Sequence, residues 1–307
     1  MQYSSFKLPM LISGIKTVSA DKILLSGLLA LLFVWLIFIS WQPNLQQLLN
    51  EFSGFMLLGI TGAIAANSTG AGGGIVFVPS FQALGMEVPQ VVATSFAIQC
   101  FGMTVGSISW LIFFHNKSNT TERVTLLYQV LIYSIPFSIL GLWFVQYTHF
   151  ALSISVPLIF SIFSLLFGVV VLCHRFYFGA KSTHRNIAKL TSVEIILIMA
   201  ISFVGGIVTA WISVGVGEIL AIVLMLRGFS VMFAIACGVI VSAITVIAGM
   251  PFYIGQQLIE TDILLFAAPG AMLGGFIARY IAQALGAKRL KLCFAIWILF
   301  VGIAGII

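Results

Sequence analysis

Long apolar runs alternate with short polar interruptions from Ile23 to the C-terminus. A helix that crosses a bilayer needs about 20 mostly apolar residues, so these runs predict membrane-spanning helices. The expected spans are 23–40, 91–114, 125–146, 152–173, 231–254, 263–284 and 291–307. Two further apolar segments, 54–85 and 193–226, contain glycine at their middle. Both are expected to begin and end on one side of the membrane, as hairpins that are either re-entrant or made of two short helices.

The composition indicates that the chain is surrounded by lipid and not by water. Of 307 residues, 61% are hydrophobic and 7% are charged, whereas soluble domains carry roughly a quarter charged residues. The expected partner is therefore the lipid bilayer. The formal charge of +6 comes from scattered basic residues, not from a basic face with interleaved aromatic residues, so no nucleic acid is expected. The four cysteines lack a CxxC spacing and predict no metal site, and no ATP-binding loop or redox motif predicts a cofactor.

The charges of the loops predict which side of the membrane each loop faces. The interruption at 174–189 holds four basic residues and no acid, which places it in the cytoplasm by the positive-inside rule. Loops around Lys117 and Lys288 are assigned to the cytoplasm in the same way. The loops at 42–51 and 256–262 carry acids and no base and are expected outside. The N-terminus is then cytoplasmic, and the C-terminus lies on the opposite side.

A duplication is visible when the chain is compared with itself. A shift of 143 residues superposes five glycines on five others, namely Gly62, Gly72, Gly74, Gly85 and Gly106 on Gly205, Gly215, Gly217, Gly228 and Gly249. A shift of 133 residues superposes Pro136, Leu140, Gly141 and Tyr147 on Pro269, Leu273, Gly274 and Tyr280. The predicted organisation is an N-terminal cytoplasmic segment with the first span (1–53), a first repeat (54–173), a cytoplasmic linker (174–191) and a second repeat (192–307). Each repeat holds one hairpin and three spans, an odd number of crossings, so the repeats are expected to be inverted.

The two hairpin tips are the candidate binding site. Glycine permits a sharp chain reversal, and the start of the returning helix presents unpaired N–H groups and the positive end of the helix dipole, which together favour an anion. The candidate substrate-binding residues are Asn67, Ser68, Thr69, Gly70, Gly72, Gly73 and Gly74 in the first tip, Ser213, Gly215 and Gly217 in the second, and Thr94, Ser95 and Gln99 after the first hairpin. Two alternatives stay open: the glycines only allow close helix packing, or the hydroxyls bond carbonyls of their own helices.

Glu218 is the acid that lies far from either predicted membrane edge. An ionisable side chain at membrane depth is costly and is usually functional, so Glu218 is a candidate coupling residue, as a proton carrier or an ion ligand. The alternatives are that it caps the start of its half-helix, or that it pairs with Arg227 or Arg279.

The first tip, followed by Val78-Pro79, Gly85 and Ala93-Thr94-Ser95, resembles the sulfite exporter TauE/SafE family of membrane permeases. The resemblance covers about residues 54 to 307, with a degenerate second copy in which Val216 and Glu218 depart from the family's more glycine-rich tip. The resemblance implies transport of sulfur-containing anions such as sulfite, organosulfonates and sulfoacetate across the bacterial inner membrane, generally outward. The residues that match the family motif are Gly70, Gly72, Gly73, Gly74, Thr94 and Ser95.

Together these features predict an all-α polytopic membrane protein of two inverted repeats with one extra N-terminal helix. The expected function is that of a secondary transporter of a small anion, working by alternating access, with a proton as the candidate coupling ion; an enzyme is not expected. The alternatives are an anion channel, an uptake permease for another small organic anion, and a membrane assembly partner that does not transport. The sequence leaves open which anion is carried, the direction of transport, the coupling ion and the oligomeric state.

Overall fold

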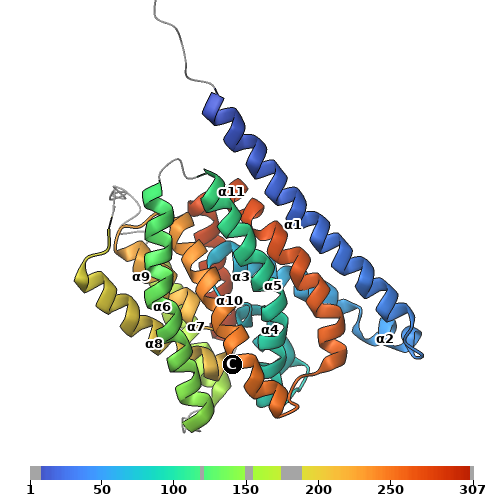
Figure 1. Ribbon diagram of the computed structural model, residues 1–307. Helices are drawn as coiled ribbons and strands as arrows, with labels where there is room; N and C mark the ends of the chain where they lie inside the picture. Colours follow the sequence, from blue (N-terminus) through green and yellow to red (C-terminus); the bar gives the residue numbers. More distant parts are fainter. Residues whose placement is uncertain (1–7, 118–120, 149–154, 174–188, 305–307) are drawn as a thin grey trace, which may run out of the picture.

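The computed structural model describes residues 8–117, 121–148, 155–173 and 189–304, and every regular element in these ranges is an α-helix (Figure 1). The helices are α1 (Leu8–Ser40), α2 (Leu45–Phe52), α3 (Gly54–Thr69), α4 (Gly74–Ala83), α5 (Val88–Lys117), α6 (Thr121–Thr148), α7 (Val156–Cys173), α8 (Ser192–Ile212), α9 (Val216–Leu226), α10 (Val231–Gly255) and α11 (Thr261–Ala304). Within the described ranges, 6 helices are long and apolar enough to cross a membrane, or 7 if the pair α2–α3, bent by 47°, counts as one span. The predicted all-α polytopic class is confirmed.

Most of the expected spans coincide with helices of the structure. The expected spans 23–40, 91–114, 125–146, 231–254 and 263–284 lie in α1, α5, α6, α10 and the first part of α11. The span expected at 152–173 corresponds to α7, and its first residues lie outside the described part of the chain. The span expected at 291–307 forms the second part of α11, beyond a break at Gly286, and its last residues are also outside the described part. Most of the expected cytoplasmic linker, 174–191, also lies outside the described part of the chain.

The expected outer loop at 42–51 contains a helix, α2, which the sequence analysis did not predict. Its glutamines, asparagine and glutamate suggested a loop. However, Leu45, Leu48 and Phe52 are spaced three and four residues apart, which places them on one helical face. All three pack in one cluster with Ile39 of α1 and Phe266 of α11. Burial of this face therefore favours a helix over a loop.

Both glycine-bearing segments form a helix, a short break and a second helix, as expected. In the first, α3 ends at Gly70, whose φ is 84°, and α4 begins at Gly74. In the second, α8 ends at Ser213, whose φ is 61°, and α9 begins after Gly215. The two hairpins differ in length, because α8 has 21 residues, enough to cross a membrane by itself, whereas α3 has 16.

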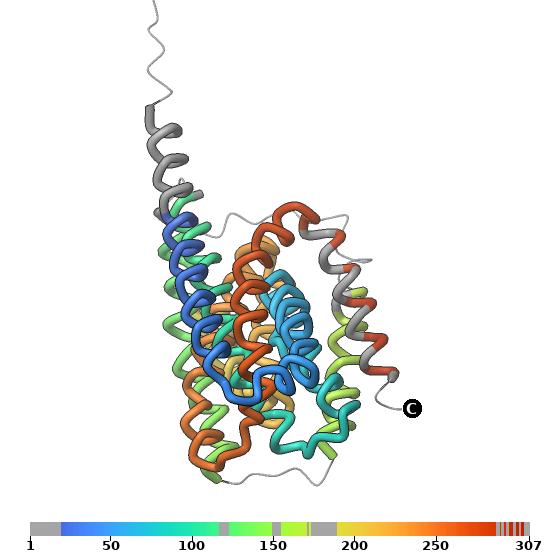
Figure 2. Tube along the Cα trace, turned by 90° about the vertical axis from the view of Figure 1, so that its right-hand side faces the viewer, coloured from blue at the N-terminus to red at the C-terminus, as the bar shows by residue number. Residues whose placement is uncertain are grey.

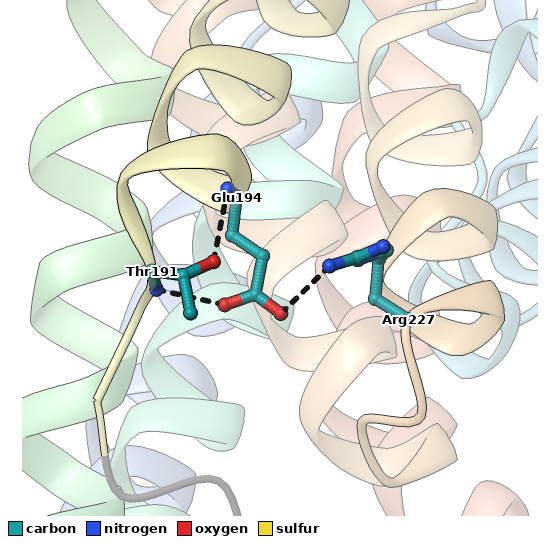
Figure 3. Close-up of polar contacts among 3 residues, drawn as sticks. All are labelled: Thr191, Glu194 and Arg227. Carbon is teal, nitrogen blue, oxygen red and sulfur yellow. Dashed lines mark hydrogen bonds and ion pairs between the residues drawn. The ribbon is translucent and has the colours of Figure 1, made fainter.

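The open end of the second hairpin is held together by polar contacts (Figure 3). At the start of α8, the Thr191 hydroxyl accepts from the Glu194 N–H at 3.3 Å, and the Thr191 N–H donates to the Glu194 carboxylate at 2.9 Å. This reciprocal pair caps the helix. The same carboxylate accepts from Arg227, which directly follows α9, at 3.3 Å. The segment therefore begins and ends at the same place, as a hairpin requires.

The centre of the bundle is apolar, and α1 lies at its edge. The share of the apolar stretch that is buried is 72% in α10 and 11% in α1. Figure 2 shows α1, in blue, running along the outside of the bundle beside α11. Trp35 of α1 donates to the Leu265 carbonyl at 2.8 Å, and Asp21 pairs with Arg279 at 2.8 Å. The exposed apolar surface of α1 suits lipid, whose tails are as apolar as leucine.

Close helix packing occurs in the same way in both repeats. A Cβ added at Gly274 of α11 would lie within 3.0 Å of the Ile60 carbonyl of α3, and a Cβ added at Gly141 of α6 would lie as close to the Phe203 carbonyl of α8. Gly141 matches Gly274, and Ile60 matches Phe203, under the shifts of 133 and 143 residues. The hairpin helix of each repeat thus packs on a spanning helix of the other, which is the reciprocity that a two-fold relation produces.

Replacing Gly274 by alanine is expected to lower the unfolding temperature of the detergent-solubilised protein, because the added methyl group meets backbone of α3. Overpacking of this kind costs about 1–3 kcal/mol. Gly27→Ala is the matched control, since a Cβ at Gly27 of α1 meets no atom within 4 Å. Equal unfolding temperatures for the two variants, measured by differential scanning fluorimetry, would contradict the close approach of α11 and α3.

Candidate functional site

The first hairpin tip turns at a glycine and then presents free amide groups. Gly70 adopts a left-handed conformation and its N–H donates to the Ala66 carbonyl at 3.1 Å, which closes the end of α3. The next residues lead into α4, whose first N–H groups have no carbonyl of their own helix to bond. The amides of Gly72 and Gly73 point instead at side chains of other helices. The tip therefore carries donors directed away from its own backbone.

The second tip has the same design with fewer glycines. Ser213 occupies the left-handed position, and its N–H donates to the Thr209 carbonyl at 2.8 Å. Gly215, with φ 147°, precedes α9, and its N–H donates to a side chain. The Val216 N–H donates to the Thr209 hydroxyl at 2.9 Å. A non-glycine residue in the left-handed region is uncommon, and Ser213 holds the position that Gly70 holds in the first tip.

The two tips touch through their backbones. A Cβ added at Gly74 would lie within 3.0 Å of the Ser213 carbonyl oxygen, and one added at Gly217 would lie 2.6 Å from the Gly70 carbonyl oxygen. Under the shift of 143 residues, Gly74 matches Gly217 and Gly70 matches Ser213. The contact is therefore reciprocal, and glycine at both positions is what allows it. Two chain reversals that lie far apart in the sequence meet inside the bundle.

One carboxylate joins the two tips. The Gly72 N–H donates to one oxygen of Glu218, and the Gly215 N–H donates to the other oxygen at 2.9 Å. Gly72 and Gly215 are equivalent under the shift of 143 residues. The Glu218 side chain is 1% exposed. A carboxyl group thus sits between equivalent amides, beside the starts of α4 and α9, where the helix dipoles favour negative charge.

Gln99 of α5 provides a second connection between the tips. Its side-chain oxygen accepts from the Gly73 N–H at 2.8 Å. Its amide nitrogen donates to the Ser213 hydroxyl at 2.7 Å and to the Ser213 carbonyl at 3.1 Å. Ser95, one turn earlier, accepts from Gln99 at 3.1 Å and from the Ser213 hydroxyl at 2.8 Å. The predicted residues Ser95, Gln99 and Ser213 are therefore brought together with both tips.

Four other candidate residues are engaged away from the contact between the tips. Asn67 and Thr69 donate to carbonyls of α3 at 2.8 and 2.7 Å, and Ser68 donates to the Ala65 carbonyl at 3.4 Å. Thr94 accepts from the Glu260 N–H at 3.0 Å, at the turn between α10 and α11. For the hydroxyls of Ser68 and Thr69 the alternative of bonding within their own helix describes what the structure has.

Two residues at the tips were not among the predicted site residues. Thr209 supports the second tip by accepting from Val216 and donating to the Gly205 carbonyl at 2.8 Å. Ser242 of α10 is 3% exposed, its hydroxyl lacks a hydrogen-bond partner among the described residues, and it lies against Gly217. The repeat offered the signal for Ser242, because it occupies the position that Gln99 has in the first repeat.

The charge of Glu218 is not neutralised by arginine. Arg227 pairs with Glu194 at 3.3 Å and Arg279 pairs with Asp21 at 2.8 Å. The pairing of Glu218 with either arginine is therefore wrong. The alternative that Glu218 caps the start of α9 is correct but incomplete, since the carboxylate also accepts from the first tip. Among the described residues, this carboxylate accepts hydrogen bonds from uncharged backbone amides.

These features define a class of protein. A multi-pass helical membrane protein, in which broken helices meet at a buried polar centre, has the architecture typical of secondary transporters. The family model described as "Sulfite exporter TauE/SafE" matches residues 55–305. The chain therefore belongs to the sulfite exporter TauE/SafE family, which is a family of membrane transporters. Neither the curated proteins nor the solved structures that were compared with the chain gave a match.

Replacing Gln99 by leucine is expected to loosen the first tip, because the Gly73 amide loses its acceptor, whereas the Ser213 hydroxyl keeps its bond to Ser95. Each buried polar group left unsatisfied costs about 1–3 kcal/mol. Hydrogen–deuterium exchange read by mass spectrometry should show faster exchange at residues 70–74 in this variant. Gln47→Leu is the control, since Gln47 of α2 is exposed and its side chain donates to Glu51 of the same helix. Unchanged exchange at the first tip would contradict the role assigned to Gln99.

Proposed function

We propose that the chain is a secondary transporter, in the bacterial inner membrane, of a small sulfur-containing oxyanion such as sulfite, an organosulfonate or sulfoacetate. The observation that carries the proposal is the pair of equivalent amides, on Gly72 and Gly215, that share one carboxylate. A sulfonate carries three oxygens on one central atom, so two of them can take the places of the two carboxylate oxygens. The same two N–H groups can therefore donate to a sulfonate, and family membership supports the choice of sulfur over other anions.

The proposed binding site is narrower than the set of candidates named from the sequence. The amides of Gly72, Gly73 and Gly215 supply the donors for the anion. Ser95, Gln99 and Ser213 form the polar wall beside them, and Gly70, Gly74 and Gly217 allow the tips to meet. Asn67, Ser68, Thr69 and Thr94 hold the surrounding backbone. Glu218 is the proposed coupling residue.

Alternating access follows if the two repeats are inverted. In such proteins the repeats exchange two pseudo-equivalent conformations, which open one central site to each side in turn. Gly74 of the first tip contacts the second tip, and Gly217 of the second tip contacts the first. These reciprocal contacts, with those of α3 and α8 to the opposite repeat, support a two-fold relation. With the cytoplasmic assignment of the basic loops, the N-terminus lies in the cytoplasm and the C-terminus in the periplasm.

The contact between the tips favours a carrier over an anion channel. Gly74 and Gly217 lie against carbonyl oxygens of the opposite tips, so an ion that passed between them would have to part packed backbone. A carrier parts these tips once in each cycle, whereas a channel would hold them apart. Saturable flux without single-channel conductance is expected.

Purified protein in proteoliposomes should take up sulfite, methanesulfonate or sulfoacetate with saturation, and acetate much more slowly. The measurement is uptake of each labelled anion, with protein-free vesicles as the blank. Failure to move any of the three sulfur anions, by protein that stays monodisperse, would contradict the proposal.

Replacing Gly73 by leucine is expected to abolish this uptake while the protein still folds. A Cβ at Gly73 would lie 2.9 Å from Gln99 and 2.7 Å from Phe77, both flexible side chains, and the larger side chain would fill the space next to the donor amides. Gly54→Leu is the matched control, because a Cβ at Gly54 of the same hairpin meets no atom within 4 Å. Uptake by Gly73→Leu at the rate of Gly54→Leu would place the site elsewhere.

A further inference from the structure

We propose that Glu218 is a tethered competitor of the transported anion, whose carboxylate holds the anion position until a substrate oxyanion displaces it together with the uptake of one proton. The proposal rests on the function proposed above and adds how the proton and the anion are linked. It makes the proton a stoichiometric partner of each anion and not only a candidate for coupling.

The first step of the argument is geometric. Glu218 uses its two oxygens on the amides of Gly72 and Gly215, one on each tip. Each N–H group donates one hydrogen bond at full strength, so the carboxylate and a second oxyanion cannot both hold this pair of donors. An oxyanion that binds between the tips must therefore take the place of the Glu218 carboxylate.

The second step concerns charge. Glu218 is 1% exposed, and the described residues that bond it are uncharged backbone amides. A displaced carboxylate would be a buried, unpaired charge next to a second anion, which is strongly unfavourable. The carboxyl group avoids this by taking up one proton from the bulk solution, delivered as hydronium that enters with the substrate. One O–H bond forms on Glu218, one O–H bond of hydronium breaks and leaves water, no bond of the substrate breaks, and the charge of the site stays the same for a monovalent anion.

The third step concerns where the neutral carboxyl group finds a partner. A protonated carboxyl group donates one hydrogen bond. Ser242 lies against Gly217, the residue before Glu218, and its hydroxyl has no hydrogen-bond partner among the described residues. The start of α9 therefore has an unused acceptor packed against the residue before Glu218, to which the neutral carboxyl group can turn.

Other ionisable groups on the surrounding helices are engaged elsewhere or remote. Glu194 pairs with Arg227 at the opposite end of α8, roughly 30 Å from Ser213 at the rise of an α-helix. His115 of α5 contacts Tyr128, and Tyr253 of α10 donates to the Ala210 carbonyl. The remaining titratable residues on α3, α4, α5, α8, α9 and α10 in the described ranges are Lys117, at the end of α5, and the thiols of Cys100 and Cys237. Glu218 is thus the acidic group that a bound anion would displace.

The test measures proton uptake when methanesulfonate binds to the purified full-length protein. Methanesulfonate is the anion of a strong acid, so its own charge does not change with pH. Isothermal titration calorimetry in two buffers of different ionisation heat should show one proton taken up per anion bound. A single linked proton makes the affinity fall about tenfold for each unit rise in pH.

Glu218→Gln removes the titrating group and keeps its shape. This variant should bind methanesulfonate without proton uptake, with an affinity that does not change with pH and that exceeds the wild-type affinity at the upper end of the range. Glu194→Gln is the matched control, a second buried glutamate outside the tips, and it should keep the wild-type proton uptake. If Glu218→Gln does not fold, the proton count of the wild-type protein decides alone.

The possible failures are distinguishable. Binding of methanesulfonate by the wild-type protein without proton uptake would overturn the competitor role and leave the transporter proposal standing. Proton uptake that survives in Glu218→Gln would overturn it in the same way. Absence of binding by both proteins at every pH, with both folded, would overturn the proposed anion site and with it the competitor role.

Discussion

The structure depends on one interaction, the sharing of the Glu218 carboxylate by amides of two chain reversals. Helices that break inside a membrane leave N–H groups that neither water nor lipid can satisfy there. In this protein the two sets of free amides meet and are satisfied by one buried acid and by Gln99. The hydrogen bonds between the carboxylate and the amides offset both the cost of burying the acid and the cost of breaking the helices. This mutual dependence explains why a charged residue is tolerated at the centre of so apolar a chain.

Close packing brings the two reversals to this point. Glycines of α6 and α11 let the hairpin helices α8 and α3 approach backbone to backbone, each against a helix of the other repeat. Gly74 and Gly217 do the same at the tips. The polar centre can therefore be small, because glycines let the backbones of the two tips touch beside the bridging side chains of Glu218 and Gln99. The pair of Glu194 and Arg227 closes the far end of the second hairpin and fixes the direction from which its tip enters.

Much of this arrangement could be predicted from the sequence, because it depends on patterns that the chain carries openly. The lengths of the apolar runs predicted the membrane spans, and the glycine-bearing segments at 70–74 and 213–217 predicted the two helix breaks. The isolation of Glu218 in an apolar run marked it as a candidate for the buried centre, where the structure places it. Which groups bond one another could not be predicted. The shift of 143 residues aligns Gly72 with Gly215, but it does not show that both amides donate to the same carboxylate. The helix α2 was missed for a related reason: its polar composition suggested a loop, and only contact with α1 and α11 buries Leu48 and partly buries Leu45.

The most direct test of the central claim is a density map of the protein in lipid that resolves side chains, recorded with and without methanesulfonate. Without the anion, the Glu218 carboxylate should lie between the amides of Gly72 and Gly215. With it, the sulfonate should occupy that position and Glu218 should point away. Tips that lie apart in both maps, or a sulfonate bound away from them while Glu218 keeps both amides, would contradict the account.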